Sequence, residues 1–203
     1  MTQVQTPLNR LAVANGETLA WSVRTYVIGI INLTPDSFSG DGLDGDVDGA
    51  VDLALRFQDE GADILDIGAE STRPGHNQVF LDEELARLMP ALEAVAKRVD
   101  LPISVDTYKA AVARRAVDAG AVIINDISGL KAEPELAEVA AETCAGLVLM
   151  HSQKGTKYRD LVPDLVSSLK DSVRIALEAG VPRDNIIVDP GIGFGKTPDQ
   201  NLA

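Results

Sequence analysis

One unit recurs along most of this chain of 203 residues and limits its fold more than any other feature: a helix-like stretch, a glycine, and a short apolar run. The glycine precedes the apolar run in "EGADILDIG", "AGAVIIND", "CAGLVLMH" and "AGVPRDNIIVDP". A glycine at this place is typical of a helix C-terminus, and continuous β-branched runs are typical of parallel strands buried on both faces. The recurrence therefore predicts an α/β fold with a parallel sheet.

The expected strands are the apolar runs, and the expected helices are the stretches whose apolar residues lie three and four positions apart. The strands are predicted over residues 26–32, 64–67, 103–106, 122–125, 147–150 and 186–188. The helices are predicted over residues 51–57, 84–99, 110–119, 135–141 and 165–179. Residues 1–25 precede this pattern and are expected to form an N-terminal extension or a hairpin.

The spacing of the units bears on the closure of the sheet. Five units occupy about 32 residues each, so a closed (β/α)8 TIM barrel would need about 64 further residues. We therefore expect residues 26–203 to form a partial TIM barrel with six of its eight βα units. An open, doubly wound sheet of six strands is the alternative.

Composition excludes several classes of partner. The chain carries 31 acidic against 18 basic residues and a formal net charge of -13, which repels nucleic acids and anionic membranes. The N-terminus has no secretory pattern, so we expect a cytoplasmic protein. The single cysteine, Cys144, excludes an internal disulfide and is expected to be a small packing residue.

Polar residues stand at or directly after the C-terminal end of every expected strand. In a parallel barrel the C-terminal ends of the strands face one mouth, where catalytic residues of such barrels gather. One such residue could be a helix cap, but a polar residue after every strand points to a binding site. These residues are Asn32, Asp66, Asp106, Asn125, Asp126, His151 and Asp189.

The segment "DPGIGFGKTPDQ", residues 189–200, contains the Gly-Lys-Thr of a nucleotide-binding P-loop. A P-loop needs a glycine five positions before the glycine of Gly-Lys-Thr, so that backbone N–H groups can surround the phosphates. Pro190 stands at that position. The segment therefore does not fit a P-loop.

Six motifs in order resemble the dihydropteroate synthase family, which has a pterin-binding TIM barrel. They are "GIINLTPDSFSGDG", "ADILDIGAESTRPG", "SVDTYK", "IINDISG", "MH" and "DPGIGFGK". Each motif alone is a weak signal, but six in the family's order are specific. The last motif then becomes the loop after the sixth strand of a pterin site.

The resemblance implies a transferase of folate biosynthesis that is a target of sulfonamides. That family condenses 6-hydroxymethyl-7,8-dihydropterin pyrophosphate with p-aminobenzoate to give dihydropteroate and pyrophosphate, with the help of Mg²⁺. We also expect a homodimer, because an open barrel leaves strand edges unpaired and apolar helix faces uncovered. Loss of pyrophosphate gives a cation delocalised into the pterin ring, so the weakly basic amine needs no strong base.

The resemblance also assigns roles to individual residues. It places Asp106 and Asp189, as catalytic residues, and Asn125 on the pterin; Asn32 would give Mg²⁺ an amide oxygen. Arg73 is the third catalytic residue, a fork for phosphate oxygens. The remaining substrate-binding residues are Asp36, Phe38, Thr72, Pro74 and Phe194, which with Arg73 line the aminobenzoate pocket, together with Met150, Gly193 and His151.

The chain departs from the family pattern in two respects. It has neither the Lys-Ser segment of the seventh strand nor the Arg-x-His segment of the eighth, and "MHSQKGT" places Ser152 and Lys154 at the rim. An inactive or non-catalytic pterin-binding fragment is therefore one alternative function. A domain like the methyltetrahydrofolate:corrinoid methyltransferases is another, although "TPDSF" and "STRPG" favour the synthase.

Overall fold

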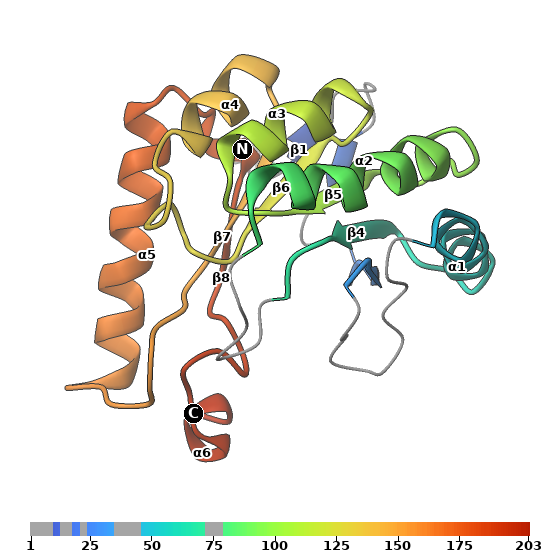
Figure 1. Ribbon diagram of the computed structural model, residues 1–203. Coiled ribbons are helices and arrows are strands. Elements are labelled where there is room, and N and C mark those ends of the chain that lie inside the picture. The colour runs from blue at the N-terminus through green and yellow to red at the C-terminus, as the bar shows by residue number, and fades with distance from the viewer. Residues whose placement is uncertain (1–9, 13–17, 21–23, 35–45, 72–78) are drawn as a thin grey trace, which may run out of the picture.

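A computed structural model describes residues 10–12, 18–20, 24–34, 46–71 and 79–203 (Figure 1). Six parallel strands form one sheet in sequential order: β3 (Ile28–Asn32), β4 (Ile64–Gly68), β5 (Ile103–Asp106), β6 (Ile123–Asp126), β7 (Gly146–Met150) and β8 (Ile186–Asp189). The helices are α1 (Val47–Asp59), α2 (Leu81–Ala96), α3 (Ala110–Asp118), α4 (Leu136–Thr143), α5 (Leu161–Glu178) and α6 (Pro198–Asn201). A 3-10 turn, η1 (Arg183–Asn185), precedes β8.

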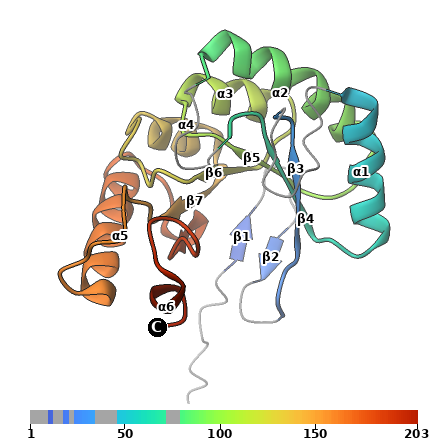
Figure 2. The ribbon, with the colours of Figure 1, turned by 60° about the horizontal axis from the view of Figure 1, so that its bottom comes forward.

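The order of the strands decides between the two expected architectures. Helices α1 to α5 form an arc around one face of the sheet, and the opposite face is concave (Figure 2). A doubly wound sheet would reverse its strand order and place helices on both faces. The fold is therefore of the TIM-barrel type, with six consecutive strands.

The main core lies between the sheet and this arc of helices. Ile31, Leu65, Val105, Ile124 and Leu149 point outward from five strands and are fully buried against the helices. Because alternate strand residues face opposite sides, the intervening residues face the concave side, which we call the inner face. The outer core thus holds the sheet while the inner face carries polar residues.

The expected strands and helices are present, but the first strand is not buried on both faces. Ile28 and Ile30 of β3 are 51% and 58% exposed on the inner face. Val188 of β8 is 49% exposed. β3 and β8 are the two ends of the described sheet, so each has one paired neighbour and less cover than the strands between them.

A small hairpin covers part of the inner face. Strands β1 (Arg10–Ala12) and β2 (Thr18–Ala20) pair antiparallel, and Leu19 packs against Ile64, Val122 and Ile123 near the beginnings of β4 and β6. The hydroxyl of Tyr26 accepts a hydrogen bond from the Ala20 backbone N–H at 3.1 Å. The hairpin therefore lies at the end of the barrel opposite the strand C-termini. A domain boundary between residues 25 and 26 stays a prediction.

Cys144 corrects one expectation. It does not pack in the core but is exposed at the C-terminal cap of α4, with a φ of 55°. This left-handed conformation is the usual end of a helix, where glycine is the common residue. The local turn, and not apolar packing, places this side chain.

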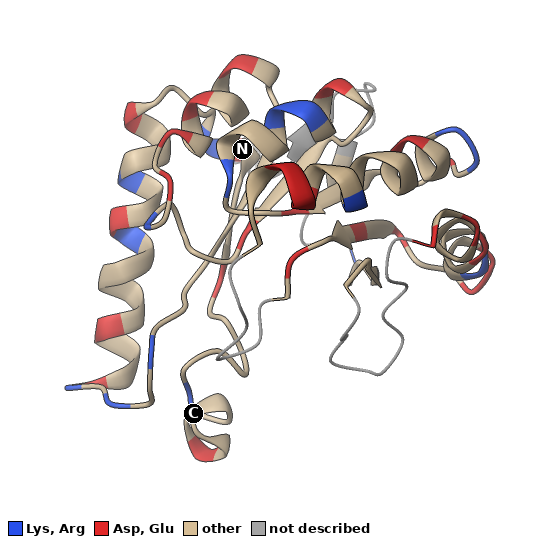
Figure 3. Cartoon of the chain, viewed as in Figure 1, with Lys and Arg blue, Asp and Glu red and all other residues tan. Residues whose placement is uncertain are grey.

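The outer surface carries charges of both signs. Acidic and basic residues alternate along α5 (Figure 3), and Arg174 of that helix pairs with Glu178 at 2.8 Å. In the described part of the chain, no helix combines the length and apolar character required to cross a membrane.

A buried ion cluster joins three segments near the C-terminal ends of β4 and β5. The Lys109 ammonium donates to Glu70, which follows β4, and to Oε2 of Glu84 in α2 at 2.5 Å. Thr107 donates to Oε1 of Glu84 at 2.7 Å. Burial lowers the pKa of Lys109, but the hydrogen bonds to the two carboxylates outweigh it and the pKa lies above its usual value. The cluster therefore fixes the β4 and β5 loops to the first turn of α2.

We expect Lys109→Met to destabilise the protein by about 3–5 kcal/mol, because two buried carboxylates would lose their counter-charge. The measurement is the free energy of unfolding in urea. Lys97→Met is the control, since Lys97 is an exposed lysine just beyond α2. A loss no larger than that of the control would mean that the ion cluster does not hold these loops.

Candidate active site

The register of the sheet aligns polar residues on the inner face near the C-terminal ends of the strands. Asn32 pairs with Gly68, Gly68 with Asp106, and Asp106 with Asn125. Residues paired in this way point to the same side of a parallel sheet. Asn32, Asp106 and Asn125 therefore form one row, which we call the inner row.

Met150 and Asp189 extend this row toward the mouth on the last two strands. Val148 and Ile187 continue the inner row on β7 and β8, and Met150 pairs with Asp189 two residues further along. Because the side-chain period is two, Met150 and Asp189 share the inner face. The sheet thus brings five of the proposed site residues to one face.

Asp106 has an unusual electrostatic environment. Burial raises the pKa of Asp106 well above its ordinary value, and the negative charge of Asp66 raises it further. Its side chain makes no hydrogen bond with any residue of the described ranges, and it lies against Gly68, where an added Cβ would come within 3.2 Å of Asp106 Cβ. With respect to the described residues, Asp106 is therefore a carboxyl group with open hydrogen-bonding capacity, and it faces the inner side.

Asp189 begins the glycine-rich loop and is partly committed to it. Its Oδ1 accepts a hydrogen bond from the Gly191 backbone N–H at 2.7 Å. This contact fixes the side chain at the end of β8 and leaves Oδ2 for another partner. Phe194 and Gly193 lie further along the same loop, where the Gly193 N–H donates to Asn201 of α6 at 2.8 Å.

The glycines of this loop allow a close approach of two backbones. Gly191 has a φ of 70°, and a Cβ there would lie 2.0 Å from the His151 carbonyl oxygen. Gly195 has a φ of 64°, and a Cβ there would lie 2.4 Å from the Gln153 carbonyl oxygen. Side chains at these positions would clash with the loop after β7. The glycines therefore serve loop packing.

Lys196, the lysine of the Gly-Lys-Thr sequence, points into its own loop. Its ammonium donates to the carbonyl oxygens of Gly191 at 2.8 Å and Phe194 at 3.1 Å. Its nitrogen also lies 3.3 Å from His151 Nδ1. This buried arrangement agrees with the exclusion of a P-loop from the sequence.

His151 is a buried, neutral neighbour of that lysine. Burial lowers the pKa of His151, and the charges of Lys196 and Lys131 lower it further. Because an ammonium can only donate, Nδ1 of His151 accepts and its proton resides on Nε2. His151 is 3% exposed, and its ring lies beside that of Tyr158. The contacts of His151 with Lys196 and Tyr158 do not test its predicted role in binding a diphosphate, which stays a prediction.

Asp126 differs from the other polar residues at strand ends. Its Oδ1 accepts from the Ser128 N–H at 2.7 Å and its Oδ2 from the Leu130 N–H at 2.6 Å. Leu130 has a φ of 63°, so the carboxylate holds a tight, left-handed turn. Asp126 is therefore a loop brace.

The five remaining predicted site residues lie outside the described ranges. They belong to the loops after β3 and β4 and are Asp36, Phe38, Thr72, Arg73 and Pro74. Their roles stay predictions.

Sequence reasoning assigned no role to three buried residues of this end of the barrel. Asp66 stands among the polar residues near strand ends, but nothing in the sequence showed that it contacts Asn125. Lys109 and Lys196 lie inside quoted motifs, and their internal partners follow only from the folded loops. An ionisable residue in an otherwise apolar strand, such as Asp66, was the available signal.

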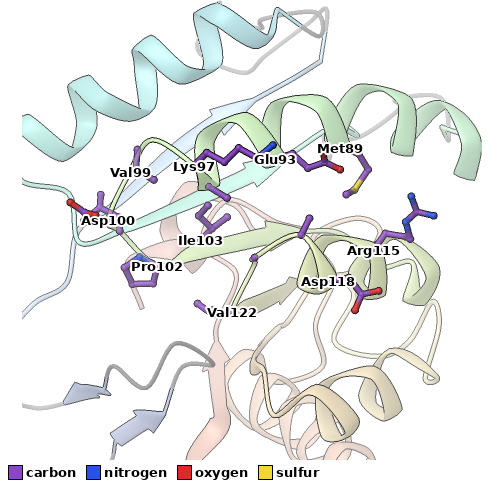
Figure 4. A pocket seen from close by; sticks show the side chains of 14 residues that line it. Met89, Glu93, Lys97, Val99, Asp100, Pro102, Ile103, Arg115, Asp118 and Val122 are labelled. Carbon is purple, nitrogen blue, oxygen red and sulfur yellow. The ribbon is translucent and has the colours of Figure 1, made fainter.

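A wide cavity of the described structure lies at the other end of the barrel. It measures about 960 Å³ and opens between α2 and α3 (Figure 4). Pro102, Ile103 and Val122, at the N-terminal ends of β5 and β6, form its floor. In parallel barrels this end serves stability. The cavity therefore does not belong to the candidate site.

Hard cations prefer oxygen ligands, and Mg²⁺ is usually held by few protein groups. Within the described ranges, no group of three or more His, Cys, Asp or Glu residues is placed to hold a metal. The Asn32 side chain is half-buried at the end of β3 and makes no hydrogen bond to another described residue. Its amide oxygen is thus compatible with one coordination position of Mg²⁺.

Comparisons with known proteins identify the family. The family model described as pterin binding enzyme matches residues 28–203. The dihydropteroate synthase of Bacillus subtilis (strain 168) is 54% identical over 185 residues, which are 91% of this chain and 65% of that protein. That of Synechocystis sp. is 46% identical over 196 residues, 93% of this chain and 68% of that protein.

Solved structures agree with these relatives. The dihydropteroate synthase of Yersinia pestis, in a sulfonamide drug complex, matches with a TM-score of 0.88 at 42% identity and covers 95% of this chain and 72% of that chain. The Xanthomonas albilineans enzyme with 4-aminobenzoic acid matches with a TM-score of 0.85 at 38% identity, over 96% of this chain and 70% of that chain.

The chain spans about two thirds of the length of the curated relatives it matches, 65% and 66% for those of Bacillus subtilis and Clostridium beijerinckii. The match nevertheless covers the whole six-stranded sheet and the inner row. The chain therefore belongs to the pterin-binding enzyme family, and its relatives there are dihydropteroate synthases.

Proposed function

We propose that this protein acts as a dihydropteroate synthase. It would join 6-hydroxymethyl-7,8-dihydropterin pyrophosphate to p-aminobenzoate and release pyrophosphate, as a transferase of folate biosynthesis. The observation that carries the proposal is the alignment of Asn32, Asp106 and Asn125 in one row, with Met150 and Asp189 beside it. A polar row of this kind, at the mouth of a barrel, suits a flat heterocycle with many nitrogen atoms.

Asp106, Asn125 and Asp189 would recognise the pterin through its N–H groups and ring nitrogens. A buried donor or acceptor left without a partner costs about 1–3 kcal/mol, so a matched set of groups selects the ligand strongly. Asp106 makes no side-chain hydrogen bond to another described residue, and the loop contact of Asp189 uses only its Oδ1. Met150 would supply an apolar contact beside Asp189.

Asn32 would hold Mg²⁺ through its amide oxygen, together with water and the diphosphate. When bound, Mg²⁺ would neutralise the negative charge that develops on the departing pyrophosphate. The residues of this chain would orient the diphosphate toward the C-terminal end of β3. Arg73 would add donors for the phosphate oxygens.

The amine needs no strong base in this reaction. Loss of pyrophosphate leaves a cation that the electron-rich dihydropterin stabilises, and the amine nitrogen then forms the new C–N bond and releases a proton. The lowered pKa of His151 and its contact with Lys196 at Nδ1 leave it neutral and committed to its loop. His151 would therefore orient groups through Nε2–H, without acting as a general base.

We also propose a cytoplasmic homodimer. The lone, exposed Cys144 suits a reducing compartment. Val162 and Val166 of α5 are 56% and 44% exposed, and Leu177 near its end is 39% exposed, which supports burial of α5 in a symmetric contact.

The proposed activity should be tested on the intact protein. Calorimetry with 6-hydroxymethyl-7,8-dihydropterin pyrophosphate should show binding, and pyrophosphate should appear only after p-aminobenzoate is added. Binding without release on adding the amine would favour the alternative of a non-catalytic pterin-binding protein. Binding of methyltetrahydrofolate with methyl transfer to a corrinoid would instead favour the methyltransferase.

Asp106→Asn should make the protein more stable at pH 7 but a weaker pterin binder. The pKa of Asp106 is higher in the folded protein than in the unfolded chain. The stability contributed by the protonated carboxyl is therefore lost as the pH rises from about 4, the ordinary pKa of an aspartate, through the raised pKa of the folded state. The asparagine amide of the variant stays uncharged at every pH, so the variant does not lose this stability. The melting temperature of the variant should therefore exceed that of the parent at pH 7, and the difference should shrink toward pH 4.

Asp118→Asn serves as the control for this pH series, since Asp118 is an exposed aspartate at the end of α3. Its melting temperature should follow that of the parent at every pH. An Asp106→Asn difference that is equally large at pH 4 and pH 7 would show that the buried charge is not its cause.

Asn32→Ala should reduce the effect of Mg²⁺ on the binding of pterin pyrophosphate. Loss of one oxygen ligand weakens the metal site, and we expect about a tenfold loss of the Mg²⁺-dependent affinity, which corresponds to ~1.4 kcal/mol. The measurement is calorimetry with Mg²⁺ and with EDTA. Equal Mg²⁺ dependence in parent and variant would remove Asn32 from the metal site.

A further inference from the structure

Asp66 is a buried carboxylate of the inner face that has no role in the proposed reaction. It lies in the middle of β4, where its register partners are Ile30 of β3 and Ser104 of β5. Asp106 and Asn125 stand one row closer to the mouth. Asp66 is 7% exposed. It therefore lies directly beneath the proposed pterin-binding residues.

One hydrogen bond joins Asp66 to that row. Nδ2 of Asn125 donates to Oδ2 of Asp66 at 3.0 Å. Burial raises the pKa of Asp66, and the neighbouring Ser104 side chain opposes this shift. The other carboxylate oxygen, Oδ1, is buried and has no hydrogen-bond partner within the described ranges.

This arrangement is costly for stability. A buried carboxylate with an unpartnered oxygen loses hydration that its contacts do not replace. Its negative charge also raises the pKa of the nearby Asp106 carboxyl. An apolar residue of similar size would fold as well in the middle of a strand. The cost points to a use of Asp66 in binding.

The contact fixes the orientation of the Asn125 amide. The terminal torsion of an asparagine is broad and roughly two-fold, so the free amide can exchange the places of its oxygen and nitrogen. With Nδ2 held by Asp66, Oδ1 must point away from Asp66. A ligand above the row then meets an acceptor and the second N–H of Asn125 at fixed places.

We infer that Asp66 is a positioning residue that holds the Asn125 amide in one orientation and thereby makes the site selective for heterocycles with a matching donor pattern. The inference rests on the proposed pterin-binding function. In this proposal Asp66 acts on the ligand through Asn125.

The orientation can be tested without any ligand. In the parent protein the side-chain amide protons of Asn125 should give NMR signals of a hydrogen-bonded group with slowed exchange. Asp66→Ala should shift these signals and speed their exchange, whereas Asp66→Asn keeps an acceptor oxygen and should preserve them. Ser104→Ala removes a polar neighbour of Asp66 but leaves the Asn125 contact, so the Asn125 signals should persist in this control. Unchanged Asn125 signals in a folded Asp66→Ala protein would overturn the inference.

A double-mutant cycle tests the effect on binding. The probe is 6-hydroxymethyl-7,8-dihydropterin pyrophosphate, and the measurement is calorimetry of the parent, Asp66→Ala, Asn125→Ala and the double variant. We expect Asp66→Ala to weaken binding at least ~10-fold in the parent but less than ~2-fold in the Asn125→Ala background, because Asp66 acts through Asn125. Asp66→Asn should restore most of the affinity. Equal losses in both backgrounds, or no loss in the parent, would contradict the inference.

Selectivity gives a readout that a purely structural role would not change. The analogue with an oxo group in place of the 2-amino group replaces a donor by an acceptor, so the parent should bind it more weakly. Asp66→Ala should reduce this preference, because the freed amide can turn. An unchanged preference would overturn the selectivity claim. Absence of any pterin binding by the parent would contradict the proposed function instead, and the NMR comparison would then decide the orientation alone.

Discussion

The candidate site depends on the parallel register of the sheet. Side chains of a strand alternate between its faces, so a slip of one residue would turn every polar residue of that strand into the outer core. The register instead aligns Asn32, Gly68, Asp106 and Asn125 across four strands. Gly68 leaves the space that the Asp106 side chain occupies. A single geometric constraint thus assembles groups from distant parts of the sequence.

The two faces of the sheet divide stability from binding. The outer face is covered by α1 to α5 and contains fully buried residues such as Leu65 and Leu149. The inner face carries Asp66 and Asp106, whose burial raises their pKa values and costs stability. The outer core must offset this cost. Such a division is expected where a rigid scaffold holds a polar site.

The loops at the mouth are held from within. Lys196 binds carbonyl oxygens of its own loop, and Gly191 and Gly195 allow that loop to contact the backbone after β7. Asp189 is fixed by the same loop through the Gly191 N–H. Asp189 and the loop residues that hold it are therefore close together in sequence, and contacts within the loop fix its conformation at the mouth.

The sequence by itself determined the α/β class, the strands and helices to within a few residues, the family, and the residues of the inner row. Periodicity, glycines at helix ends and ordered motifs are local signals, so they can be read without coordinates. Only the tertiary structure decided the strand order, the exposed inner face of β3, the exposed turn at Cys144 and the contact between Asp66 and Asn125. Each of these depends on which segments become neighbours in space. Side chains 59 positions apart, such as Asp66 and Asn125, carry no mark of their contact in the sequence.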